Sequence, residues 1–260
     1  RPEVNLIPLL ISSRMHEDEK LSCILMIQDA EDNKDGMKST FQKIINSSKF
    51  DHSRKETTSM FDSSSIRAFN SGEFDIAISL VSKFEEMASP TRQMVVSKLR
   101  SLISIGRMSA AESFLEENSS LLTPVQNLRF LLDLGRKDLV IERLEEEEFG
   151  SKSLKEKKII ADIFFRLNMH EEYCEIYNLE IMGGKFTLTE LTRYFHSLCK
   201  LGEEERLQEE FSILRRYNSF NSERRTILAI VGYDFLLCDD YIEELEMAVS
   251  ISPIDTSIPI

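Results

Sequence analysis

The feature of this sequence that most constrains its fold is a short turn that recurs along the chain. Gly72, Gly106, Gly135, Asn168 and Gly202 each follow one apolar helical stretch and precede another. Successive turns lie 34, 29, 33 and 34 residues apart. A repeat of that length is typical of stacked helix–turn–helix units, each of which buries its apolar face only against its neighbours. The spacing therefore predicts consecutive helical hairpins.

The side chains around the turns follow the same register. Positions three and four residues before each turn, and five and nine residues after it, are apolar or nearly so. We expect Thr123 to cap one helix and Thr187 or Thr189 another, and Pro90 to lie in a first helical turn. Amphipathic helices of similar length without a true repeat are the alternative. The expected pairs are 59–70 with 74–88, 91–105 with 108–118, 125–134 with 137–148, 154–167 with 171–180, 188–201 with 203–217 and, more weakly, 222–237 with 241–251.

The ends of the chain do not follow the repeat. Residues 1–55 are expected to form an irregular N-terminal segment, in which the apolar run Leu21–Ile27 favours helix slightly over a buried strand. Residues 56–252 are expected to form the repeat domain, and residues 253–260 a tail or linker. Both termini resemble cuts in a longer polypeptide, so we expect the chain to be a domain of a larger protein.

Composition excludes several classes of protein. The net charge of −13 disfavours general affinity for nucleic acid or anionic membranes. The four cysteines are widely spaced, which indicates reduced thiols and a cytoplasmic location rather than a disulfide framework. No apolar run reaches the length of a membrane span, and no signal peptide is visible.

The sequence around the first two turns resembles the tetratricopeptide repeat family. Asn70–Ile78 (NSGEFDIAI) has Gly in the turn, an aromatic residue two positions later and a small residue five positions later, and Gly106–Ala111 (GRMSAA) repeats this pattern with Met for the aromatic residue. The resemblance covers about residues 57–250 and implies an all-α, right-handed αα solenoid of five to six helical hairpins. The chain departs from the family in lacking Trp, and in replacing the small residue by Val140, Tyr173 and Leu207.

No motif for catalysis, a cofactor or a metal stands out. Gly183–Lys185 lacks the rest of a phosphate-binding loop, and Glu31–Gly36 lacks the last ligand of a calcium loop. The pairs His170/Cys174 and His196/Cys199 lack the tight spacing of structural zinc sites. Acidic runs such as Glu145–Glu148 are typical of solvated helix faces. We therefore expect neither an enzyme nor a bound cofactor or metal.

The resemblance directs attention to the first helix of each hairpin, because these helices line the concave surface in tetratricopeptide stacks. Arg supplies paired hydrogen bonds to carboxylates, and a basic inner groove in an acidic chain favours an acidic peptide or a terminal carboxylate. Ordinary solvated side chains paired with nearby acids are the alternative. Asp133 and Asp162 are expected on the same face. The expected ligand-binding residues are Arg100, Arg129, Lys158, Arg166, His196 and Lys200.

These features predict a protein- or peptide-binding scaffold. Two alternatives stay open: an assembly or substrate-orienting domain of a larger enzyme, such as a sugar-transferring polymerase, and a peptide-sensing regulatory domain. Because repeat arrays expose apolar faces at their ends, self-association through the terminal repeats is also expected.

Overall fold

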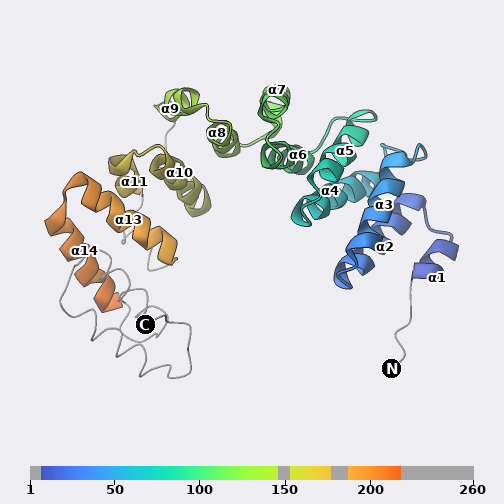
Figure 1. Ribbon diagram of the computed structural model, residues 1–260, viewed down its shortest axis with the longest axis horizontal. Helices are drawn as coiled ribbons and strands as arrows, with labels where there is room; N and C mark the ends of the chain where they lie inside the picture. Colours follow the sequence, from blue (N-terminus) through green and yellow to red (C-terminus); the bar gives the residue numbers. More distant parts are fainter. Residues whose placement is uncertain (1–6, 146–152, 177–186, 218–260) are drawn as a thin grey trace, which may run out of the picture. The chain divides into compact units, whose positions relative to one another are not determined.

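The computed structural model describes residues 7–145, 153–176 and 187–217, and every regular element in these ranges is a helix. The predicted all-α fold of successive helical hairpins is confirmed for this part of the chain (Figure 1). The expected pair at 222–251 and the tail at 253–260 lie outside the described residues. The helices are α1 (Ile7–Ser12), α2 (Glu17–Ala30), α3 (Lys34–Asn46), α4 (Lys55–Asn70), α5 (Phe74–Glu85), α6 (Arg92–Ser104), α7 (Met108–Asn118), the 3₁₀ turn η1 (Ser119–Leu121), α8 (Pro124–Asp133), α9 (Lys137–Glu145), α10 (Leu154–Arg166), α11 (His170–Ile176), α13 (Leu188–Leu201) and α14 (Glu204–Tyr217).

Each predicted turn has the same backbone geometry. The turn residue is left-handed, with φ between 60° at Asn168 and 79° at Gly135. Its N–H donates to the carbonyl three residues earlier, and the next N–H donates to the carbonyl five residues earlier, as in Glu73 N to Ala68 O at 2.9 Å. This pair of hydrogen bonds satisfies carbonyls that the ending helix leaves without partners. Glycine suits the position because L side chains disfavour positive φ.

A further turn of the same kind lies in the N-terminal segment. Asp32 has φ 50°, and Asn33 N donates to Gln28 O at 2.8 Å, as in the glycine turns. It joins α2 to α3, so residues 17–46 form a hairpin. Leu21–Ile27 lies within α2, so the helix interpretation of this run is confirmed and the strand alternative does not form. The sequence analysis did not assign this hairpin to the repeat, because Asp32 is neither Gly nor Asn.

The buried positions repeat with the turns. Residues four before the turn and five and nine after it are buried in every hairpin where the structure describes them, because these positions face the partner helix and the next hairpin. This register holds in the N-terminal hairpin as well. The buried residues at these positions are Gln28, Met37, Phe41, Ala68, Ala77, Val81, Leu102, Ala111, Leu115, Leu131, Val140, Leu144, Phe164, Tyr173, Leu198, Leu207 and Phe211.

The helix starts follow their capping residues. Thr123 accepts a hydrogen bond from Gln126 N at 3.2 Å, and Thr187 accepts one from Glu190 N at 3.3 Å, so both predicted caps are confirmed. Thr91 is the N-cap of α6, which begins at Arg92. Pro90 therefore precedes the helix, and its expected place in the first turn is wrong because the Thr91 hydroxyl caps the helix one residue later.

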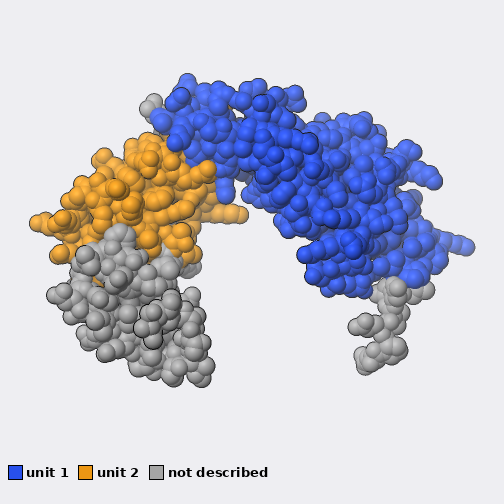
Figure 2. Space-filling model, viewed as in Figure 1, with its two compact units in different colours: residues 1–142 blue, residues 143–260 orange. Residues whose placement is uncertain are grey.

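The chain divides into two compact units, residues 1–142 and 143–260 (Figure 2). In the first unit α2 packs against α3 and α4, α3 packs against α5, and α4 packs against both α5 and α6. Residues 17–46 therefore belong to the same unit as the hairpins that follow them. In the second unit α10 packs against α11, α11 against α13, and α13 against α14.

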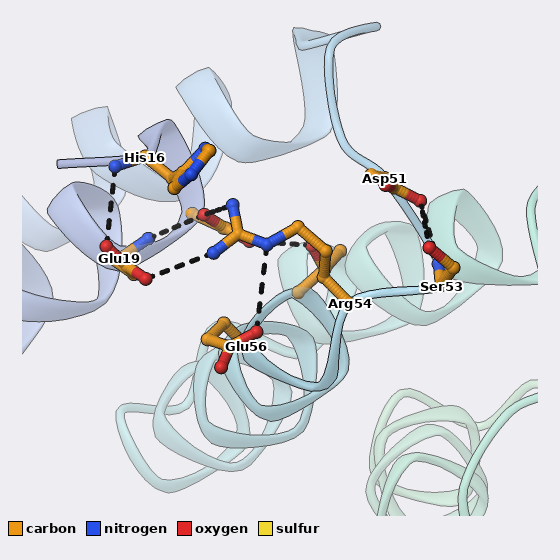
Figure 3. A network of polar contacts seen from close by, with 8 residues as sticks. His16, Glu19, Asp51, Ser53, Arg54 and Glu56 are labelled. Carbon is orange, nitrogen blue, oxygen red and sulfur yellow. Dashed lines mark hydrogen bonds and ion pairs between the residues drawn. The ribbon is translucent and has the colours of Figure 1, made fainter.

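A polar network ties the first helices of two hairpins together in the first unit (Figure 3). The carboxylate of Asp18 is almost fully buried, and it accepts hydrogen bonds from Arg54 (3.1 Å) and from the Thr57 hydroxyl (2.8 Å). Arg54 also pairs with Glu19 at 3.0 Å. A buried carboxylate needs such partners because desolvation strongly disfavours an unpaired charge.

Ion pairs also link consecutive second helices in the first unit. Lys38 Nζ lies 2.8 Å from Glu73, and Arg107 lies 3.2 Å from Asp75. Arg136 pairs with Glu112. In each pair one partner is the residue directly after a turn and the other lies in the second helix of the preceding hairpin, so adjacent hairpins are joined by charge at three successive steps.

The turn geometry makes a stability prediction. Gly106→Ala places a Cβ on a left-handed residue and lowers the free energy of unfolding by about 1–2 kcal/mol. Asn168→Gly removes such a strain and raises it by about 0.5–1 kcal/mol. Urea unfolding followed by circular dichroism measures both, with Ser109→Ala, an exposed helical site in α7, as the control. Equal stability of Gly106→Ala and the control would contradict the role of the turn.

The polar network around Asp18 makes a second stability prediction. Arg54→Met leaves the buried Asp18 carboxylate without a cation and with only two neutral partners, the Thr57 hydroxyl and the Glu19 N–H, so we expect it to lower the free energy of unfolding by about 3 kcal/mol. Arg67→Met removes the more exposed pair with Asp29 (3.0 Å) and is the matched control, with an expected loss of at most about 1 kcal/mol. Similar losses in the two variants, measured by chemical denaturation, would contradict this account.

Candidate functional site

Five of the six predicted binding residues occupy repeated register positions on first helices. Arg100, Arg129 and His196 each lie six residues before a turn, and Arg166 and Lys200 each lie two residues before one. All five are exposed. Arg100 and Arg129 belong to the first unit, and the others to the second. Equivalent positions of stacked hairpins fall on the same face, so within each unit the predicted cations share the face of the first helices.

Lys158 and Asp162 are instead engaged in pairs that hold α10 to α13. Lys158 Nζ lies 2.9 Å from a carboxylate oxygen of Glu190, and Asp162 accepts a hydrogen bond from Arg193 at 2.5 Å. Glu190 also completes the capping box of α13 with Thr187. Lys158 therefore contributes to helix packing.

The structure gathers aromatic and cationic side chains around Phe165 on α10. The rings of Tyr173, His170 and His196 lie 5.4, 6.0 and 6.1 Å from its centroid. The guanidinium of Arg193 lies over the Phe165 ring at 4.9 Å, within cation–π range. We call Phe165, His170, Tyr173, Arg193 and His196 the Phe165 cluster.

His170 is the most perturbed titratable group of the cluster that faces solvent. Its Nδ1 lies 3.0 Å from the Ser197 hydroxyl, and its ring centroid lies 5.9 Å from that of His196. Partial burial lowers the pKa of His170 below its usual value, and the positive charges of His196 and Lys200 lower it further. His170 is therefore largely neutral at pH 7.

The buried phenol and thiol next to the cluster are inert. Burial raises the pKa of Tyr173, whose hydroxyl donates to the backbone carbonyl of Glu190 at 3.3 Å. Burial also raises the pKa of Cys174 to about 12, so this thiol is not ionised at neutral pH. In the described ranges no group of three or more His, Cys, Asp or Glu side chains is placed to hold a metal ion.

The sequence predicted part of this site. It identified His196, Lys200 and Arg166 from their register, but it assigned Phe165 to the core and considered His170 only as a zinc ligand. It did not identify Arg193. The signal that was available is the position three residues before the turn, where Leu132 is buried but Phe69, Ile103 and Phe165 are only partly buried and Cys199 is exposed. This position borders the exposed face of the first helices.

Comparison with known proteins gives structural resemblances at low identity. No protein-family profile matches the chain, and no curated protein matches its sequence. A solved tetratricopeptide repeat protein from Parabacteroides merdae is 10% identical, with a TM-score of 0.49 over 90% of this chain and 93% of that one. YrrB, a tetratricopeptide repeat protein with an unusual peptide-binding site, is 12% identical, with a TM-score of 0.38 over 83% and 93%. The tetratricopeptide repeat domain of P58(IPK) is 16% identical, with a TM-score of 0.30 over 96% and 78%.

Because these TM-scores are low, the description of the helical hairpins is based on the turns and helix contacts of this chain and not on the comparisons. No helix in the described ranges combines the length and the apolar character that crossing a bilayer requires.

The electrostatics of the cluster can be tested directly. Lys200→Met removes a cation that disfavours the imidazolium form, so we expect the pKa of His170 to rise. The chain has four histidines, and NMR titration of their Hε1 signals measures each pKa. Lys155→Met, an exposed cation elsewhere on α10, is the control and should leave His170 unchanged. A rise of equal size in both variants would contradict the local effect of Lys200.

Proposed function

We propose that this chain is a protein- or peptide-binding scaffold that recognises acidic partners through the exposed face of its first helices. In the first unit the proposed contacts are Arg100 and Arg129. In the second unit they are Arg166, His196 and Lys200, with Phe165 as an apolar neighbour. Lys158, bound to Glu190, supports the second-unit surface by holding α10 to α13.

The observation that carries the proposal is the pairing state of the first-unit arginines. Arg54, Arg67, Arg107 and Arg136 each form an ion pair. The exposed arginines Arg14, Arg92, Arg100 and Arg129 form no ion pair with a described residue, and of these Arg100 and Arg129 lie at the same register position of first helices. In a chain of net charge −13, two exposed cations at a repeated position favour an external carboxylate.

In the second unit, an aromatic side chain next to cations supports the same proposed function. Phe165 offers a partly exposed aromatic surface beside His196, and Lys200 follows His196 by one helical turn. Aromatic and cationic side chains together suit a peptide segment that combines apolar and acidic residues. The cytoplasmic location and the self-association of the terminal repeats stay predictions.

Charge reversal tests the proposal. Peptides are selected from a random display library on the intact chain, and we expect the selected sequences to be enriched in Asp and Glu. Arg100→Glu with Arg129→Glu, and Arg166→Glu with Lys200→Glu, should each weaken binding of such a peptide about tenfold or more, measured by fluorescence anisotropy. The control is Lys43→Glu with Lys137→Glu, which makes the same change in net charge on the second helices α3 and α9.

Circular dichroism of each variant verifies that it is folded. Selected peptides without an excess of acidic residues, or equal affinity of both first-helix variants and the control, would rule out recognition of an acidic partner by these faces.

A further inference from the structure

The two histidines of the Phe165 cluster form a closely spaced pair, in which His170 is partly buried and His196 is exposed. His170 begins α11 and His196 lies in the middle of α13, and these helices pack against each other (Figure 1). Their ring centroids are 5.9 Å apart, and both rings contact Phe165 edge-on. The pair is thus held by ring contacts on one side, while His196 is exposed to solvent.

The surroundings of the pair are cationic. On α13, Lys200 and His196 both act against protonation of His170, and Arg193 is bound to Asp162 of α10. Arg166 is the other cation near the end of α10. The acids of α11 itself, Glu171 and Glu172, do not contribute to the shift at His170, and Arg206 and Glu210 of α14 interact with Tyr194 instead.

We infer that His170 and His196, together with Lys200, form a proton-linked binding site for a carboxylate side chain of the partner, so that binding tightens as the pH falls. This inference rests on the proposed function and adds that pH regulates the binding. When protonated, each imidazole carries a positive charge and donates from both ring nitrogens, and an anion between the two rings and Lys200 offsets their mutual repulsion.

The direction of the pH dependence follows from the linkage between proton binding and ligand binding. Without a ligand, partial burial and then the charges of His196 and Lys200 lower the pKa of His170. A bound carboxylate favours the imidazolium forms, so binding takes up protons and the affinity must rise as the pH falls. Each proton taken up changes the affinity by at most about tenfold per pH unit. A partner carboxylate, with a pKa near 4.3, stays ionised above about pH 5.5.

The experiment titrates the four histidines of the intact chain by NMR with and without hexaglutamate. We expect hexaglutamate to raise the pKa of His170 and His196 and to leave His16 and His52 unchanged. The affinity for hexaglutamate should be about five-fold or more higher at pH 5.5 than at pH 7.5. In His170→Gln combined with His196→Gln this pH dependence should be lost, while His52→Gln, an exposed control in the first unit, should retain it.

The outcomes separate this inference from the proposed function. If hexaglutamate shifts backbone signals of first-helix residues but leaves the pKa of both histidines unchanged, the proton linkage is wrong and acidic-peptide binding stands. If hexaglutamate changes no signal at any pH, the proposed histidine site is ruled out. The proposed function is then tested by the peptide selection and the charge-reversal variants, which do not depend on hexaglutamate. An unchanged pH dependence in the double variant likewise overturns the inference.

Discussion

The left-handed residue that ends the first helix of each hairpin is the constraint on which the described structure depends. It lets two hydrogen bonds close the helix end and reverses the chain within three residues, so that the second helix begins at a fixed register. Because the register is fixed, the residues four before and five and nine after the turn face the core in every hairpin. The exposed face of the first helices, where Arg100, Arg129 and His196 lie, is set by the same register.

The sequence predicted the hairpins well because the turn depends on one residue type. Glycine at Gly72, Gly106, Gly135 and Gly202 is visible in the sequence, and so is the apolar register around each. The turn at Asp32 was not assigned to the repeat, because there a short polar side chain takes the positive φ in place of glycine. The helix at Leu21–Ile27 was left ambiguous for a related reason, since a continuous apolar run fits both a buried strand and a buried helix.

The candidate site was harder to predict, because it depends on which side chains meet between helices. Register alone placed Lys158 and Lys200 on the same face, yet Lys158 lies 2.9 Å from Glu190, an acid of the next first helix. Arg193 was not identified because its place in the cluster depends on two contacts with α10, an ion pair with Asp162 and a cation–π contact with the ring of Phe165. Such pairings join residues about thirty positions apart, and no local pattern in the sequence reports them.

The Phe165 cluster coincides with the hairpin that departs most from the small-residue pattern. Where the preceding hairpins have Ala77, Ala111 and Val140, this one has Tyr173. Its ring is buried and contacts Phe165 at 5.4 Å, while its hydroxyl reaches the backbone of α13. Tyr173 on α11 thus links the ring of Phe165 on α10 to the backbone of α13, and the same three helices carry Phe165 and the two histidines. The departure from the small-residue pattern therefore lies where these aromatic and basic side chains meet.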